Sequence, residues 1–247
     1  MRTLKLLCLA LGMSGAMALA APSISEAYSF QPIVVALDPA GEGARQQFLV
    51  ENTESRRIAL QIKIVRREAK ASGGERTSPE RENFIVTPPQ MVLDPGQKQV
   101  IRLQWIGPSN LEKEQAYHLI VDPVEVRTEQ NLEQSQVKVL FRYKASVYVR
   151  PEGVQPDLQV GNVARRSANE IAVDLQNNGS QHILPDDVEL AVQSEAGQQV
   201  TLSGDEVEAI KSTNFIAGER QTVALKSDEL SRLDGPLTGE IRTGSNQ

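Results

Sequence analysis

The sequence of 247 residues holds a single cysteine, Cys8, which lies in the N-terminal segment. That segment, "MRTLKLLCLALGMSGAMALA", has a short basic start followed by an apolar run from Leu6 to Ala20, which is the layout of a secretory signal peptide. We expect cleavage after Ala27 rather than at the competing site after Ala20, because "YSFQPIVV" then opens the mature chain in a strand-like segment. A mature chain without a thiol has no disulfide framework, no cysteine metal site and no thiol nucleophile.

Long apolar runs and an excess of basic residues are also missing. After residue 27 no segment reaches the roughly 20 apolar residues of a membrane-spanning helix, so we expect an exported protein that does not insert into a membrane. Removal of Arg2, Lys5 and Glu26 with the signal changes 26 basic and 32 acidic residues to 24 and 31, a net charge of −7. Nucleic-acid binding needs a clustered basic surface, and this balance argues against it.

Histidine is scarce, with only His118 and His182 in the chain. No HxH or HExxH spacing and no GxSxG elbow is present, so neither a metal centre nor a common nucleophile motif is indicated. We expect both histidines to be hydrogen-bonded or at the surface, and we expect no cofactor. Enzymatic activity is the weaker class, although an exported hydrolase with a serine–lysine pair stays an alternative, because such a pair is assembled only in the folded chain.

What the sequence does contain is a succession of short strand patterns separated by turn-rich pieces. This spacing is typical of antiparallel β-sandwiches. The segment "RPEGVQPD" (150–157) has two prolines and a glycine near the middle of the chain, and we place the division between two all-β domains, 28–150 and 151–247, at its start. A helix is weakly indicated only at "SGDEVEAIKS", and "GERTSPEREN" (74–83) is expected to be a solvated loop.

One stretch, "VKVLFRYKASVYVRP" (137–151), alternates over an unusual length. Every odd position from Val137 to Val149 is apolar or aromatic, which is the period of a strand. Thirteen residues would span roughly 43 Å at about 3.3 Å each, whereas ordinary strands have about 5–6 residues. The apolar stripe is therefore longer than the core of one small domain requires.

Three blocks of the sequence form a combined pattern: "NFIVTPPQMVLDPGQKQVIRLQW" (83–105), "EQAYHLIVDPVEV" (114–126) and "RYKASVYVRP" (142–151), with Asn52 in "FLVEN" as a further match. Together they resemble the first domain of the periplasmic pilus chaperones of the chaperone–usher pathway. The residue pattern of the last block is similar to that of the divergent, archaic-type branch of these chaperones. Beyond residue 151 the resemblance is faint, and "VDLQNNGSQHI" is the best candidate there.

The resemblance implies two immunoglobulin-like β-sandwich domains in a boomerang arrangement. It also implies donor-strand complementation, in which the chaperone lends a strand to an incomplete pilus subunit and delivers it to an outer-membrane usher. On this basis we expect Val137, Val139 and Phe141 to enter the subunit, with Tyr143 and Lys144 also in the binding site. The later odd positions, Ala145, Val147 and Val149, are expected to line the chaperone's own core.

Two departures from the better-known branch concern the anchor for the subunit's terminal carboxylate. The first-strand region "PIVVALDP" holds no basic residue, and the usual lysine position falls on Ser146. Lys144 is the substitute we expect, with Arg142 and Arg150 as competitors. The alternative function for the whole chain is an exported two-domain adhesin or structural surface protein.

Overall fold

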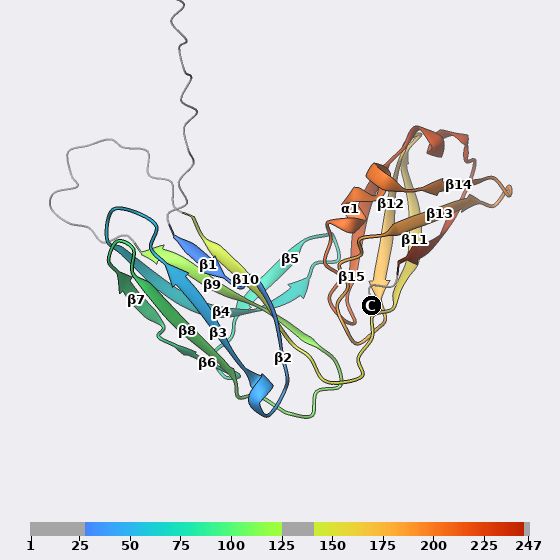
Figure 1. Ribbon diagram of the computed structural model, residues 1–247. Coiled ribbons are helices and arrows are strands. Elements are labelled where there is room, and N and C mark those ends of the chain that lie inside the picture. Colours follow the sequence, from blue (N-terminus) through green and yellow to red (C-terminus); the bar gives the residue numbers. More distant parts are fainter. Residues whose placement is uncertain (1–27, 125–140, 245–247) are drawn as a thin grey trace, which may run out of the picture.

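The computed structural model describes residues 28–124 and 141–244, and this part of the chain consists mainly of strands (Figure 1). Two hydrophobic cores are formed, one from residues between Tyr28 and Val149 and the other from residues between Val163 and Leu237. Each core lies inside its own β-sandwich. The expected fold class, all-β with two sandwich domains, is confirmed.

The first sandwich has two sheets. One sheet has four strands in the order β1 (Ser29–Gln31), β3 (Arg45–Glu51), β8 (Lys98–Trp105) and β6 (Phe84–Thr87). The other runs in the order β2 (Val34–Leu37), β10 (Tyr143–Val149), β9 (Gln115–Val124), β4 (Ile58–Ala69) and β5 (Glu75–Pro79), with β7 (Gln90–Leu93) also paired to β4. A short 3₁₀ turn, η1 (Glu42–Ala44), connects β2 to β3.

Strand alternation explains which face of each strand enters this core. In β8, Ile101, Leu103 and Trp105 are buried while the residues between them are more exposed, as the period of two requires. The rings of Phe84 and Trp105 meet edge-on with centroids 5.0 Å apart. Such pairs add to the stability gained by burying the rings, so a core without disulfides is held by packing.

The chain changes sheets between β1 and β2. β1 pairs with β3 in the first sheet, whereas β2, two residues later, runs parallel to β10 in the second sheet. The bend lies at Pro32, which cannot donate a ladder hydrogen bond. Because of this switch, β1, β2 and β10 lie along the same side of the sandwich.

The second sandwich is a single hydrogen-bonded path of strands that folds over itself. The order is β14 (Gln199–Leu202), β13 (Val188–Ser194), β16 (Leu237–Thr243), β11 (Leu158–Ser167), β12 (Glu170–Asn177) and β15 (Arg220–Lys226). β11 has register irregularities and pairs with β16 at Val163 alone, so the path bends there. Buried residues from both halves of the path meet in one core.

The remaining elements are helical turns and two strands that the sequence analysis did not expect. The expected helix at "SGDEVEAIKS" is present as η3 (Gly204–Val207) followed by α1 (Glu208–Lys211), and a further 3₁₀ turn is η4 (Asp228–Arg232). The interpretation of residues 74–83 as a solvated loop was wrong, because Glu75–Pro79 pair with β4 as β5. The turn-rich piece "TPPQMVLDPGQK" likewise contains a strand, β7, which pairs with the start of β4.

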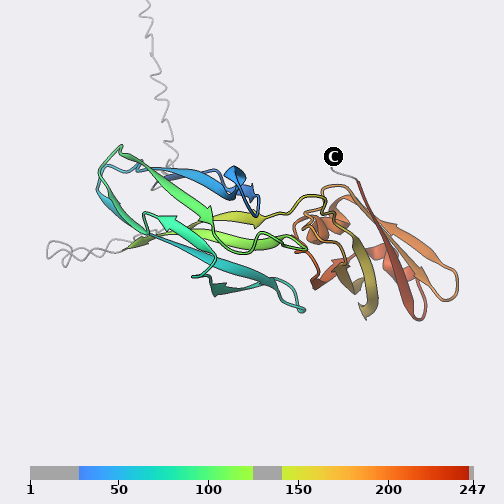
Figure 2. The same cartoon turned by 90° about the horizontal axis from the view of Figure 1, so that it is seen from below.

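The two sandwiches meet at an angle and form a boomerang-like outline (Figures 1 and 2). β10 ends at Val149 and β11 begins at Leu158, so the chain passes from one sandwich to the other inside the segment 150–157. The domain limits 28–150 and 151–247 themselves stay predictions. In the described part of the chain, no helix is both long and apolar enough to cross a membrane.

Candidate functional site: the open edge of β10

The two edges of β10 have different partners. On one side β9 pairs with it antiparallel over the whole strand, from Tyr143 opposite Val121 to Val149 opposite Gln115. On the other side β2 runs parallel and pairs only with the second half, beginning at Ser146 opposite Val34. The first half of β10 thus has a sheet on one side and no paired strand from the described residues on the other.

The directions of the backbone hydrogen bonds show which residue has its N–H and C=O on the unpaired side of β10. The N–H of Ser146 donates to the carbonyl of Ile33 at 2.8 Å, and the N–H of Arg150 donates to the carbonyl of Leu37 at 2.8 Å. Alternate residues of a strand direct their N–H and C=O groups to the same side, so those of Lys144 point along this edge before β2 begins. We call the segment 141–145 on the β2 side the open edge of β10.

Apolar surface accompanies the open edge. Ile33 and Val34, where β2 begins, are 59% and 61% exposed, which is unusual for adjacent large apolar residues. Beside the bend between β1 and β2 lies an open hollow of about 340 Å³, lined by Gln31, Pro32, Gln47, Phe48, Leu49 and Val100. Unpaired strand edges with nearby apolar surface are sites where another strand can be added.

The inner face of β10 belongs to the first core, as the sequence predicted. Ala145, Val147 and Val149 are each 0% exposed, so the expectation that these three residues line the chain's own core is confirmed. Tyr143 is partly buried against the same core, and its ring lies edge-on to that of Tyr28 at 4.7 Å between centroids. The apolar stripe is therefore core from residue 143 onward.

Phe141 lies between β10, whose inner face belongs to this core, and the segment that precedes β10. It is half-buried and lies before β10, so the single strand expected to cover 137–149 begins only at Tyr143 within the described residues. The Tyr28 hydroxyl lies 3.0 Å from the Phe141 carbonyl and 2.8 Å from that of Val121, and it can donate to either. Burial raises the pKa of Tyr28 far above its usual value, so this donor keeps its proton.

The remaining predicted donor residues, Val137 and Val139, lie outside the described residues. Their insertion into a partner stays a prediction. Of the five residues expected in the site, three are described: Phe141 lies just before β10, and Tyr143 and Lys144 are its first two residues. The side chain of Tyr143 packs against the first core, and the role of all three in binding a subunit stays a prediction.

Basic residues near the open edge differ in what they already bind. Arg142 forms an ion pair with Asp122, which also contacts the Lys63 ammonium at 2.5 Å. Burial acts to raise the pKa of Asp122, but the hydrogen bonds from Lys63 and Arg142 outweigh it and hold the pKa below its usual value. Lys144 is exposed and has no ion-pair partner among the residues that the structure describes. It is the basic residue that remains available to a partner.

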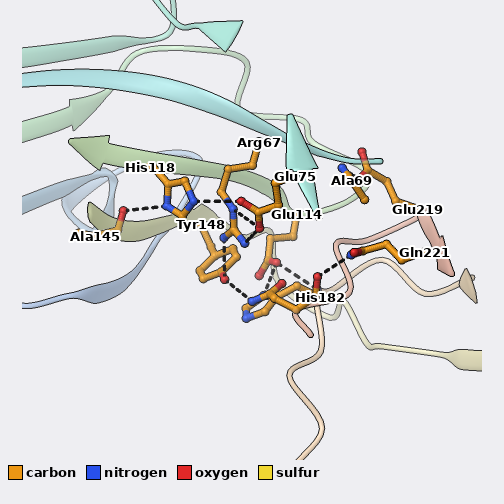
Figure 3. A network of polar contacts seen from close by, with 11 residues as sticks. Arg67, Ala69, Glu75, Glu114, His118, Ala145, Tyr148, His182, Glu219 and Gln221 are labelled. Carbon is orange, nitrogen blue, oxygen red and sulfur yellow. Dashed lines mark hydrogen bonds and ion pairs between the residues drawn. The ribbon is translucent and has the colours of Figure 1, made fainter. Parts of the chain in front are cut away.

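Arg150, the other competitor, binds Glu114 at the contact between the two domains, where Figure 3 shows Glu114 beside His182. Nε of Arg150 lies 2.6 Å from the carboxylate of Glu114, and the same carboxylate lies 2.5 Å from Nδ1 of His182. Burial acts to raise the pKa of Glu114, but hydrogen bonding to His182, together with Arg150, lowers it overall. The ring of His182 stacks flat on that of Tyr148, with centroids 3.6 Å apart.

A second polar group lies on the outer face of the β9–β4–β5 sheet (Figure 3). Arg67, 5% exposed, forms an ion pair with Glu75 and donates to the Tyr148 hydroxyl at 3.0 Å. His118 has one ring nitrogen 3.1 Å from Glu75 and the other 3.4 Å from the Ala145 carbonyl. Burial acts to raise the pKa of Glu75, but His118 and Arg67 lower it to about 2.

These junction residues were missed by sequence reasoning, apart from the expectation that both histidines are hydrogen-bonded or exposed. Glu75 is 43 residues from His118, and Glu114 is 68 residues from His182. No spacing within one element signals such contacts. Across residues 28–124 and 141–244, no group of three or more His, Cys, Asp or Glu side chains is placed to hold a metal ion.

Comparison with known proteins gives one family. The family model described as "Pili and flagellar-assembly chaperone, PapD N-terminal domain" matches residues 34–155, which include β2, β10 and the open edge. No curated protein sequence matches the chain significantly.

Three solved structures with the same fold are 13–17% identical to this chain. The crystal structure of CfaA, a class 5 fimbriae chaperone, is 15% identical, with 89% of this chain and 100% of that chain covered and a TM-score of 0.55. The CsuC–CsuE chaperone–tip adhesion subunit complex of archaic Csu pili from Acinetobacter baumannii gives 17% identity, coverage of 79% and 88%, and a TM-score of 0.53. The SafA pilin–SafB chaperone complex of Salmonella enterica gives 13% identity, with 87% of this chain and 95% of that chain covered and a TM-score of 0.51.

The fold is that of two-domain β-sandwich chaperones of known structure. This chain belongs to the family of pili and flagellar-assembly chaperones, and its first sandwich is the family's N-terminal domain. The family and the fold are those of chaperones that are not enzymes.

Proposed function

We propose that this protein is a periplasmic chaperone that caps pilus subunits by donor-strand complementation and passes them to an outer-membrane usher. The observation that supports this most directly is the half-paired edge of β10, where β2 begins only at Ser146. An incomplete subunit would pair its own strand edge with the main chain at Lys144. This is strand addition, in which backbone hydrogen bonds supply affinity and alternate side chains supply specificity.

The side chains that precede β10 fill the subunit's groove in this proposal. Phe141 is only half-buried in the free protein, and Val137 and Val139 share its parity along the sequence. Full burial of one such side chain contributes about 1.5–3 kcal/mol. Three of them would hold a subunit firmly, yet a competing strand of better fit could replace them without any cofactor or catalysed step.

Lys144 is the proposed anchor for the subunit's C-terminal carboxylate. Arg142 and Arg150 are already paired with Asp122 and Glu114, whereas the ammonium of Lys144 is exposed on the same strand. A charge-assisted hydrogen bond of this kind contributes roughly 1.5–3 kcal/mol. Export to the periplasm rests on the signal-like segment 1–27 and on the family.

The experiment is coexpression of the tagged chaperone with the small secreted proteins encoded beside its gene. The proposal expects a one-to-one complex that survives gel filtration. If the tagged chain instead bound a surface carbohydrate or matrix protein and recovered no neighbour-encoded subunit, the adhesin alternative would replace it.

A further inference from the structure

The hairpin formed by β4 and β5 extends beyond the sheet that it belongs to. β4 pairs with β9 only as far as Arg66 opposite Tyr117, and its last residues, Arg67–Ala69, pair only with β5. Figures 1 and 2 show this hairpin extending from the first sandwich toward β15 of the second. A hairpin that leaves its own sheet loses the support of neighbouring strands. Contacts at its far end are then needed to hold it in one position.

The tip of the hairpin binds the edge of β15. The carbonyl of Ala71 accepts a hydrogen bond from the N–H of Thr222 at 3.1 Å. The Thr222 hydroxyl lies 2.9 Å from the same carbonyl and 2.6 Å from the Asp174 carboxylate, and it can donate to either. The N–H of Ala69 donates to the carboxylate of Glu219, which is partly buried. β15 is the last strand of its sheet and pairs with β12 on its other side. The hairpin thus covers an otherwise exposed strand edge.

A tight turn brings the two backbones together. The turn is closed by hydrogen bonds from the N–H of Lys70 to the carbonyl of Gly74 and from the N–H of Gly73 to the carbonyl of Lys70, each 2.9 Å. Gly73 and Gly74 both have positive φ, at 94° and 76°. A Cβ on Gly73 would lie 3.3 Å from the carbonyl oxygen of Thr222, whereas a Cβ on Gly74 would meet nothing within 4 Å.

The domains also touch at a separate place beside the linker. There Tyr148 packs with Ala116 and Ile216 in a small apolar cluster, and Glu114 binds His182. A contact next to the linker alone leaves the domains able to rotate about it, since relative motion of two domains is the ordinary expectation unless their interface is large and apolar. A second contact away from the linker removes that rotation.

We propose that the β4–β5 hairpin is a brace that fixes the angle between the two domains by docking its tip on Thr222 and Glu219 of the second domain. The inference rests on the contacts of the hairpin and is independent of what the open edge of β10 binds. Its consequence is that the domains stay folded but move relative to each other when the tip is displaced.

The two glycines of the turn provide a matched pair of variants. Gly73→Ala and Gly74→Ala impose similar strain on a left-handed backbone, but only Gly73→Ala pushes against β15. Spin labels on cysteines placed at the exposed positions Gln99 and Glu240, in the mature chain without Cys8, report the distance between domains. We expect a narrow distribution for the parent and for Gly74→Ala, and a clearly broader one for Gly73→Ala.

Amide hydrogen exchange at Thr222 supplies a second, local readout. In the parent protein this N–H should be protected although it lies on an edge strand, and Gly73→Ala should speed its exchange by about tenfold or more, the loss expected for one hydrogen bond. Should Gly73→Ala disturb the fold of the hairpin itself, Thr222→Val removes the hydroxyl, which contacts the Ala71 carbonyl and the Asp174 carboxylate. Asp174→Asn is its control for the contact inside the second domain, and Thr201→Val on the exposed edge of β14 is its control for the substitution itself. If the distances between the two spin labels are distributed as narrowly in Gly73→Ala and in Thr222→Val as in their control variants, the proposal that the hairpin fixes the angle between the domains is wrong.

Discussion

Asn52 and Asn177 occupy equivalent places in the two domains and make the same set of hydrogen bonds. Each is 0% exposed and directly follows or ends a core strand. The side-chain amide of each donates to the carbonyl four residues later, that of Arg56 or Gln181, and to a distant carbonyl, that of Leu93 or Phe215. The side-chain oxygen accepts from the N–H two residues later in both cases. The two sandwiches are therefore closed at one end by the same asparagine turn.

Replacement of either asparagine should unfold its own domain selectively. Asn52→Ala leaves the buried Leu93 carbonyl and the partly buried contacts with Arg56 and Glu54 without their partner, and we expect a loss of about 1–3 kcal/mol in the stability of the first domain. Trp105 is the only tryptophan and lies in that domain, so its fluorescence in urea reports that loss. Asn177→Ala should leave the Trp105 transition almost unchanged and lower the midpoint seen by circular dichroism. If both variants shift the urea midpoint of Trp105 fluorescence equally, the expectation that each asparagine stabilises only its own domain is wrong.

Acid should weaken the polar group around Glu75. The pKa of Glu75 is lowered from 4.5 to about 2 in the folded protein. A depressed carboxyl pKa gives stability that is fully present above the unfolded value and is lost as the pH falls from about 4.5 toward 2. The full shift corresponds to roughly 3 kcal/mol at most. Urea unfolding between pH 6 and pH 2.5 should show this loss, and Glu75→Gln should flatten the curve in that window while lowering stability at pH 6. An unchanged slope in Glu75→Gln would assign the acid loss to other carboxylates.

Much of the architecture could be predicted from the sequence because it is periodic. Alternation puts the odd positions Ala145, Val147 and Val149 on one face of the strand, the family resemblance predicts that this face lines the core, and all three are fully buried. Asn52 in "FLVEN" and the segment "VDLQNNGSQHI", which contains Asn177, belong to the family resemblance. The hydrogen bonds that Asn52 and Asn177 share appear only when loops and distant carbonyls are placed together.

The parts that sequence reasoning missed depend on contacts between distant segments. β5 carries exposed polar residues and has no apolar alternation, so its strand character follows from pairing with β4 rather than from its own pattern. The half-pairing of β10 depends on where β2 enters the second sheet, which is decided by the bend at Pro32 and not by β10 itself. The stack of His182 on Tyr148 exists only because two domains dock.

Phe141→Glu should abolish recovery of a subunit with the chaperone. A carboxylate would have to enter an apolar groove, and an unpaired buried charge is too costly to be tolerated. Val92→Glu is the control, because Val92 is 57% exposed on β7 and lies away from the open edge. Thermal unfolding of the free protein should change little in either variant. Loss of folding in Phe141→Glu, with a wild-type protein that recovers no subunit, would make the residue part of the core.

Lys144→Ala should reduce the yield of complex more than Arg142→Ala does. Lys144 has no ion-pair partner in the described part of the chain, whereas Arg142 already binds Asp122. Loss of one charge-assisted hydrogen bond corresponds to a roughly 10- to 100-fold weaker affinity. A subunit with an amidated C-terminus should bind wild type and Lys144→Ala equally. Unchanged affinity in Lys144→Ala with a free carboxylate would place the anchor elsewhere.

Thermal unfolding of the mature protein should be identical with and without reductant. The only cysteine, Cys8, is expected to leave with the signal segment, so no disulfide would remain to stabilise either sandwich. Matching melting curves at equal protein concentration test this directly. A large downward shift in reductant would mean that Cys8 is retained and forms a disulfide between molecules.

The most direct test of strand addition is amide hydrogen exchange at Lys144, measured in the free chaperone and in its purified complex with a subunit. In the free protein this N–H lies on the unpaired half of β10 and should exchange rapidly, while that of Ser146, bonded to the Ile33 carbonyl, should be protected. Binding of a subunit strand should slow exchange at Lys144 by about tenfold or more and leave Ser146 unchanged. A stable complex in which Lys144 exchanges as fast as in the free protein would contradict the proposal that the open edge of β10 receives the subunit.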